Sequence, residues 1–362
     1  EYRALPVNGD SYIQKYSFPV NTFPTTVEVV IGEDTLKTGE DFIVSANSGS
    51  AKGNYKLKRI TPENFMTEVG SDQLQNDEIQ IAYILELPKS KGREDYIAQL
   101  KIKNSIVQAA PLLVPNDGKF TWSVAQESLP FPIIEISSEL LKNKDEVQIT
   151  IENKLIESYP TQNVLGYIPA KRKCRRDKYF VFTAHYDHLG MMGETATFNG
   201  ANDNASGVAM MLSLMKYFSE NPPKYSVLFI GFGGEEAGLI GSKYYVENPI
   251  IPLDKMKFLL NVDLMGTGSE GIQVVNSTEH PKEFDQLKKI NEKENLIPAI
   301  KPRGKAANSD HFWFEEAGVP SFFVYTLGGV TYYHDILDRP ETLPLTEFDD
   351  LHKLIVKFVN SF

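Results

Sequence analysis

One stretch of the chain, 179–207, carries side chains that can bind metal ions. It begins with a run of β-forming residues and then supplies His185, Asp187 and His188 in close succession. Imidazole and carboxylate groups that come directly after a strand are typical of a ligand loop at the end of a buried strand. Asp203 follows in a loop rich in Gly and Asn, just before an apolar run at helical spacing. The sequence therefore predicts a strand, a ligand loop and a helix in succession.

Other predicted strands are also followed by acidic or imidazole side chains. Continuous apolar runs at 227–232, 258–262 and 322–325 predict buried strands. Open α/β sheets bind their ligands at the carboxyl ends of the strands. We therefore expect six side chains to meet at one rim of a sheet: His185, Asp203, Glu235, Glu236, Asp263 and His334.

This set of side chains predicts a metal site. Each motif is weak by itself, since a lone His or a pair of Glu residues is usually structural. Two imidazoles and four carboxylates at one rim would repel one another and lose hydration unless a cation were present. Nitrogen and oxygen ligands without thiolates fit zinc, with manganese or cobalt as substitutes. Two ions fit better than one, because a shared carboxylate would give each ion three protein ligands.

The apolar strands alternate with predicted helices. Strands that are apolar on both faces imply a sheet covered on both sides. We expect a three-layer α/β sandwich with a mixed, largely parallel central sheet. The helices that should cover it are 237–247, 283–294, 309–317 and 345–359.

The chain is long enough for a second, smaller domain. Its 362 residues exceed the ~250–300 at which single cores usually stop growing. We assign 1–22 and 146–362 to the larger domain and 23–145 to a β-rich insert. Within the first range, Asp10 or Ser11 could cap a short helix. Strands are expected in the insert at 26–31, 79–85 and 96–102.

Charge and composition narrow the class of protein. The net charge of -11 argues against a nucleic-acid partner, which would need a basic face. Cys174 is the one cysteine, so no intramolecular disulfide is expected, and the cationic run 171–176 around it reads as solvated surface. No apolar run approaches the ~20 residues of a membrane span. A first residue of Glu rather than Met suggests a removed leader, hence an exported periplasmic or extracellular protein.

Five segments together resemble the co-catalytic two-zinc aminopeptidase family, which also includes glutamate carboxypeptidase, glutaminyl cyclase and transferrin receptor. The resemblance covers roughly residues 150–362. The segment 129–137 resembles part of a protease-associated domain, and 309–320 resembles another stretch of the peptidase family. The five segments, in the family's order, are 185–190, 200–207, 234–238, 261–266 and 333–334.

The resemblance implies roles for the metal ligands. Asp203 would bridge two zinc ions. His185 and Asp263 would complete one zinc, and Glu236 and His334 would complete the other. Glu235 would be the general base that takes a proton from the attacking water.

Further roles also follow from the resemblance. Asp187 would orient His185 through its second ring nitrogen, and Tyr333 would donate to the oxyanion. Asp310 and His311 are candidates to support the ligands. A cis peptide bond is expected after Asp203. Two positions depart from many relatives: Asn202 replaces Asp before the bridging residue, and Leu264 replaces Met after a ligand.

The activity expected is that of a zinc exopeptidase that releases amino-terminal residues from peptides or small proteins. Glutaminyl cyclase, carboxypeptidase or dipeptidase activity on the same fold, and a non-catalytic receptor-like protein, are the alternatives. A carboxypeptidase or dipeptidase would need a cation for the substrate carboxylate, such as Arg303 or Arg339. Aromatic-rich loops and the acidic charge favour a cationic or apolar amino-terminal residue in the substrate. The oligomeric state is left open.

Overall fold

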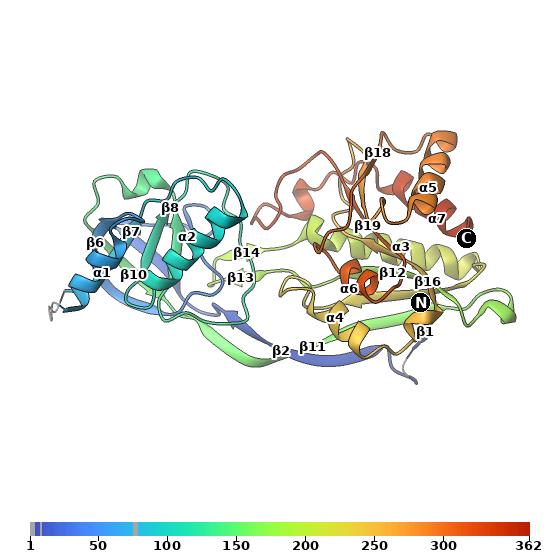
Figure 1. The fold of residues 1–362 in the computed structure, drawn as a ribbon, viewed down its shortest axis with the longest axis horizontal. Coiled ribbons are helices and arrows are strands. Elements are labelled where there is room, and N and C mark those ends of the chain that lie inside the picture. The colour runs from blue at the N-terminus through green and yellow to red at the C-terminus, as the bar shows by residue number, and fades with distance from the viewer. Residues whose placement is uncertain (1–3, 8, 75–78) are drawn as a thin grey trace.

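The chain forms two lobes, each built around its own β-sheet (Figure 1). The computed structural model describes residues 4–7, 9–74 and 79–362. The strands β2 (Ile13–Thr22) and β11 (Lys154–Ile168) form a long antiparallel ribbon that connects the lobes.

The larger sheet has nine strands and is mixed, as predicted. Its central strands β15, β12, β16 and β19 pair in parallel, and β11 and β17 pair antiparallel to either side of them. In spatial order the sheet contains β1 (Leu5–Pro6), β11, β15 (Ser226–Phe232), β12 (Tyr179–His185), β16 (Met256–Val262), β19 (Ser321–Thr326), β17 (Ile272–Val275) and β18 (Ile300–Pro302), with β2 also paired to β11.

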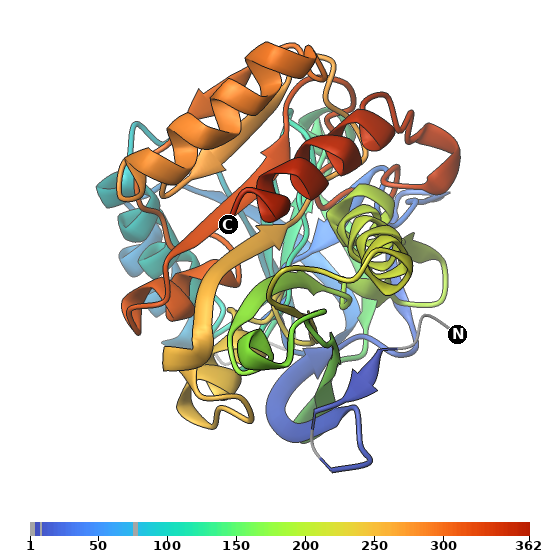
Figure 2. The ribbon, with the colours of Figure 1, turned by 90° about the vertical axis from the view of Figure 1, so that its right-hand side faces the viewer.

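Helices cover both faces of this sheet, which confirms the three-layer sandwich (Figures 1 and 2). α3 (Ser206–Glu220), α5 (Pro281–Glu294) and α7 (Phe348–Asn360) pack their apolar residues into one core. α4 (Ile240–Glu247) and α6 (His311–Glu316) contribute Tyr245 and Phe314 to the core on the other face. The buried strands therefore read as continuous apolar runs because each face meets a helix.

The second sheet is curled and has eight strands, with α1 (Phe65–Leu74) and α2 (Arg93–Ile106) as its helices. A hairpin of β13 (Gly190–Met192) and β14 (Ala196–Phe198) leaves the larger lobe and packs into the core of this sheet. The spatial order is β4 (Asp34–Thr35), β3 (Val27–Ile31), β10 (Glu146–Ile151), β6 (Ala51–Ile60), β7 (Ile81–Leu85), β8 (Leu112–Pro115), β9 (Ile133–Ile136) and β5 (Phe42–Val44).

Two sequence predictions of secondary structure were wrong. The strand expected at 96–102 is part of α2, because a short apolar run fits a helix as well as a strand. No helix follows Asp10, since pairing with β11 makes 13–22 a strand. The residues of β10 do form a strand, but they were assigned to the larger domain, and the strand pairs with β3 and β6 in the second sheet.

The remaining short elements lie in connections. The cationic run 171–176 includes a 3₁₀ turn in which Cys174 is exposed, as expected of solvated surface. In the part of the chain that the structure describes, no helix has both the length and the apolar character that a membrane crossing requires. The 3₁₀ turns are Ser138–Leu141, Lys173–Arg175, Leu253–Lys255 and Pro340–Thr342.

Candidate metal centre

The carboxyl ends of the central strands deliver the predicted ligands to one edge of the larger sheet. β12 pairs in parallel with β15 on one side and β16 on the other, so the three strands end together. His185 is the last residue of β12, Glu235 follows β15 and Asp263 follows β16. Asp203 lies in the turn before α3, and His334 in the loop after β19. Glu236 comes directly after Glu235, so the structure brings all six predicted side chains together.

Asp203 lies between the two histidines. His185 Nε2 is 3.2 Å from Asp203 Oδ1 and 3.5 Å from Asp263 Oδ2. His334 Nε2 is 3.3 Å from Asp203 Oδ2 and 3.0 Å from Glu236 Oε2. Each oxygen of Asp203 therefore faces a different imidazole. We call His185, Asp203, Glu236, Asp263 and His334 the ligand cluster.

The ring nitrogens of the ligand cluster are arranged for metal binding. Carbonyl oxygens can only accept, so His334 Nδ1 donates to Trp122 O at 2.7 Å and His185 Nδ1 to Asp187 O at 3.1 Å. Each Nε2 is then left facing the carboxylates, and within the described residues neither makes a hydrogen bond. Two sets of donor atoms lie within 4.8 Å of one another: His185 with Glu235 and Asp263, and His185 with Asp203 and Glu236. These residues fit a metal ion with nitrogen and oxygen ligands.

The charged groups of the ligand cluster shift the pKa values of one another. Burial acts to lower the pKa of His334, but Asp203 and Glu236 outweigh this effect and raise the pKa to about 10. Burial acts to raise the pKa of Asp203, but His185 and His334 hold that pKa below its usual value. Carboxylates at this depth need a cation. A proton and a metal ion compete for the same Nε2 lone pairs, so either can balance the charge.

Glu235 lies half-buried beside the ligand cluster. Burial raises its pKa well above the ordinary carboxyl value, although His185 opposes the shift. Asp187 fixes the loop that carries it, because its carboxylate accepts from the main-chain nitrogens of Glu235 and Glu236, both at 3.2 Å. The predicted contact of Asp187 with His185 is made by its main-chain oxygen, since its carboxylate is 3.7 Å from Nδ1.

Two supporting contacts were not predicted. His188 Nδ1 lies 2.8 Å from Glu236 Oε1 and so fixes one oxygen of a ligand. Asp338 accepts from the main-chain nitrogens of Asn202 and Asp203 at 2.8 and 3.0 Å. His188 could have been found from its place in the 185–190 segment, whereas Asp338 is remote in sequence. The peptide bond after Asp203 is cis, as the resemblance implies.

The insert also reaches the ligand cluster, through Trp122. Its carbonyl accepts from His334 Nδ1, and its main-chain nitrogen donates to His334 O at 3.2 Å. The indole is 6% exposed, donates to Val44 O at 2.8 Å and packs on Phe198, with ring centroids 4.8 Å apart. Gln126 of the same segment donates to Ala237 O at 2.7 Å. The second lobe therefore helps to orient a predicted metal ligand.

Replacing Trp122 is expected to weaken metal binding from a distance. Trp122→Ala should lower the free energy of unfolding by about 3–5 kcal/mol and metal affinity by about 10–100-fold, since His334 loses its acceptor when the segment moves. Zinc titration calorimetry and denaturant unfolding measure the two effects. Trp122→Phe keeps most of the packing and should affect metal affinity less. A Trp122→Ala protein that is less stable but binds zinc normally would contradict this role.

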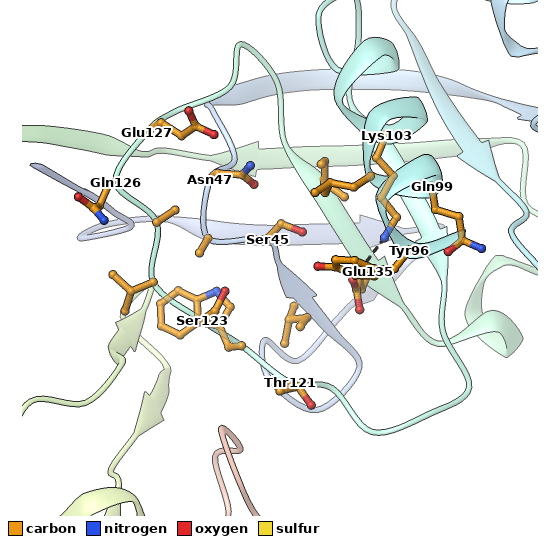
Figure 3. Close-up of a pocket in the computed structure, with 17 residues that line it drawn as sticks. Ser45, Asn47, Tyr96, Gln99, Lys103, Thr121, Ser123, Gln126, Glu127 and Glu135 are labelled. Atoms are coloured by element: carbon orange, nitrogen blue, oxygen red, sulfur yellow. Dashed lines mark ion pairs between the residues drawn. The ribbon is translucent and has the colours of Figure 1, made fainter. Parts of the chain in front are cut away.

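The same segment forms a wall of a separate pocket in the insert (Figure 3). This pocket has a volume of about 600 Å³ and holds an ion pair between Lys103 and Glu135, 3.7 Å apart. None of its lining residues belongs to the ligand cluster. The pocket is therefore distinct from the candidate metal centre, although 121–127 contacts both.

A second cavity, of about 250 Å³, opens directly onto the ligand cluster. Tyr333 is one of its walls and stacks on His334, with ring centroids 3.8 Å apart. Asp310 lies behind the cluster, fully buried, and burial raises its pKa to about 7. The cavity is lined by Asp203, Glu235, Asp263, Leu264, Arg303, Asn308, Phe323, Tyr325 and Tyr333.

His311 gives a testable pH dependence of stability. It is fully buried beside Phe323, and burial lowers its pKa from 6.5 to about 3. The unfolded chain therefore binds a proton that the folded chain does not between these pH values. The free energy of unfolding should fall as pH drops below 6.5, by up to about 1.4 kcal/mol per pH unit from this group.

Denaturant unfolding of chelator-treated protein from pH 7 to 5 would measure this slope. His311→Phe should make the slope smaller by an amount that corresponds to about one bound proton, because Phe cannot titrate. Equal slopes for both proteins would show that His311 does not remain neutral in the folded state.

Comparison with known proteins is consistent with this geometry. The profile of peptidase family M28 matches residues 163–359, more than half of the chain. Aminopeptidase YwaD of Bacillus subtilis is 27% identical over 304 residues, which is 80% of this chain and 63% of that protein. The chain thus spans less than two thirds of that relative. A probable zinc metalloprotease of Pyricularia oryzae is 35% identical over 99 residues, covering 26% of this chain and 20% of that protein.

Solved structures share the fold of both lobes. A zinc aminopeptidase from Bacillus subtilis, BSAP, superposes with a TM-score of 0.70 at 19% identity, covering 96% of this chain and 83% of that one. A peptidase M28 precursor from Shewanella amazonensis gives 0.69 at 15% identity, covering 96% and 83%. The coverage means that the second lobe is included in the match.

Proposed function

This chain belongs to peptidase family M28, and on that premise we propose that it is a zinc-dependent aminopeptidase that removes the amino-terminal residue of peptides. The observation that carries the proposal is the position of Asp203, with one oxygen facing His185 and the other facing His334. A carboxylate in that position can bridge two ions. We therefore propose two zinc ions, one held by His185, Asp203 and Asp263 and the other by His334, Asp203 and Glu236. The names of YwaD and BSAP, an aminopeptidase and a zinc aminopeptidase, support the same activity.

The residues of the chain divide the reaction among them. When bound, zinc supplies Lewis acidity that lowers the pKa of water and polarises a carbonyl oxygen. Glu235 accepts a proton from the attacking water while the oxygen of that water bonds to the peptide carbon. The carbon–nitrogen bond then breaks, and Glu235 returns the proton to the departing amine. Tyr333, on the cavity wall, donates to the oxyanion.

The raised pKa of Glu235 suits its role as the proton acceptor. Burial raises the pKa of Glu235, and a carboxylate with a raised pKa is a stronger acceptor for the proton of water. Asp187 keeps the Glu235 main chain fixed through its hydrogen bond, so the base does not need a metal bond to hold its place.

Hydrolysis of aminoacyl p-nitroanilides by untreated, chelator-treated and zinc-restored protein would test the proposal. We expect activity to be lost on chelation and restored by zinc. N-acetylated peptides should resist cleavage if the enzyme needs a free amino terminus, and their cleavage would favour a carboxypeptidase. Ammonia release from glutaminyl peptides would identify a cyclase instead. Hydrolysis that survives chelation would overturn the metal mechanism.

A further inference from the structure

Arg303 places a positive charge in the cavity next to the ligand cluster. It comes directly after β18, in a segment joined to β17 through main-chain hydrogen bonds. Its main-chain nitrogen donates to Val274 O and to Ser277 Oγ, both at 2.9 Å. Its Nη1 donates to the hydroxyl of Tyr325 at 2.8 Å. The guanidinium is thus held at the cavity wall by contacts at both ends of the residue.

The charge of Arg303 is not balanced by a neighbouring carboxylate. Lys301 pairs with Glu270 at 3.7 Å, and Lys305 pairs with Glu316. Among the described residues Arg303 has no such ion pair, and its one side-chain hydrogen bond there goes to a neutral phenol. Arg303 is exposed, so the other N–H groups of its guanidinium remain available to a ligand in the cavity that the residue lines.

The ligand cluster does not explain this charge. The acidic residues that share the cavity with Arg303 are Asp203, Glu235 and Asp263. The ion pairs that Asp203 and Asp263 form in the described structure are with histidines rather than with Arg303. A guanidinium cannot coordinate a metal ion, and an extra cation near the ions would weaken their binding. An anion that enters with the substrate would balance this charge.

We propose that Arg303 is a specificity-determining residue that binds a carboxylate of the substrate, which makes the enzyme prefer peptides with a carboxylate close to the scissile bond. This inference rests on the proposed peptidase function and narrows its substrate class. Arg is suited to the role because its planar fork pairs with both oxygens of a carboxylate. The cavity of about 250 Å³ is small for a pocket and fits one residue better than a longer stretch.

The sequence-based expectation of a cationic or apolar amino-terminal residue in the substrate did not take the positive charge of Arg303 into account. The structure also separates the two arginines considered from the sequence. Arg339 lines a different cavity, with residues 116–120, and its Nε donates to Ile336 O at 2.6 Å. The carboxylate could be an acidic side chain on the amino-terminal residue or the terminal carboxylate of a short peptide.

Two matched substrate pairs distinguish these sources. α-Glutamyl and glutaminyl p-nitroanilide differ only in the side-chain charge. The dipeptide Ala-Leu and its amide differ only in the terminal charge. We expect kcat/KM to be at least about tenfold higher for the charged member of one pair, and Arg303→Gln should bring that ratio close to one. Lys301→Gln is the matched control, since it removes an already paired cation two residues away and should leave both ratios unchanged.

The result also separates the two proposals. If Arg303→Gln leaves both ratios as they are in the unaltered protein, the carboxylate role is overturned while the peptidase survives. If zinc-loaded protein hydrolyses none of the four substrates, the proposed function fails, and titration calorimetry then compares L-glutamate with L-glutamine and Ala-Leu with its amide. Tighter binding of the charged member of either pair that is lost in Arg303→Gln supports the role, and equal affinities in both pairs overturn it.

Discussion

Glu235→Gln is expected to lower kcat for peptide hydrolysis by about 10²- to 10⁴-fold, the usual contribution of a general base. Glutamine has almost the same shape but cannot accept the proton of water. Glu235 is half-buried and Asp187 fixes its main chain, so the glutamine side chain should occupy the same position. Steady-state kinetics on an aminoacyl p-nitroanilide measures the loss.

The zinc content of the Glu235→Gln variant distinguishes a general base from a metal ligand. The donor atoms of Glu235, His185 and Asp263 lie within 4.8 Å of one another, so Glu235 could itself be a ligand. A general base leaves the zinc content of the Gln variant unchanged, whereas a ligand lowers it. Glu247→Gln makes the same chemical change on an exposed position of α4 and should have no effect on either measurement. A Glu235→Gln enzyme with more than about a tenth of the original kcat would place the base elsewhere.

The convergence of the ligands could be predicted because it depends on local patterns. His185, Glu235 and Asp263 each follow an apolar strand, and parallel strands end at the same edge of their sheet. Apolar runs, and the Gly-rich segments that follow them, are patterns of neighbouring residues. They can therefore be recognised in the sequence without knowledge of the fold. The same reasoning found the covering helices, because their apolar faces repeat at helical spacing.

The contacts that orient the ligands could not be predicted in this way. His334 donates to a carbonyl in the other lobe, 212 positions away, and Asp338 accepts from main-chain groups more than 130 positions away. A carbonyl acceptor leaves no signature in sequence, since every residue has one. Without the fold, nothing distinguishes Trp122 from any other buried aromatic residue of the insert.

The errors in secondary structure have a related cause. β2 and β11 pair over long range to make the ribbon between the lobes, so a local capping signal near Asp10 was overridden by tertiary pairing. Tyr96, Ile97 and Leu100 are among the exposed apolar residues of the chain, so α2 is not a simple amphipathic helix that its pattern would reveal. The precise limits of the two domains remain a prediction.

Asp203→Asn is expected to remove both of the proposed zinc ions and to lower kcat/KM by at least about 10³-fold, because several kcal/mol of transition-state stabilisation depend on the metal. Asp203 is 4% exposed, and its main chain is fixed by Asp338. Asparagine keeps the size of the side chain and one oxygen, but it loses the negative charge and offers an N–H₂ group to one of the two histidines. Mass spectrometry of the metal content per chain, together with kinetics, measures both effects.

Comparison with the outer ligands tests the bridging role itself. Of the two histidines in the cluster, Asp263 lies within ion-pair distance of His185, and Glu236 within ion-pair distance of His334. Asp263→Asn and Glu236→Gln should therefore each lose mainly one ion, whereas Asp203→Asn should lose two. If Asp203→Asn retained as much zinc as Asp263→Asn, the two ions would not share this carboxylate. One oxygen for each imidazole, at 3.2 and 3.3 Å, is the geometry that makes the larger loss the expected one.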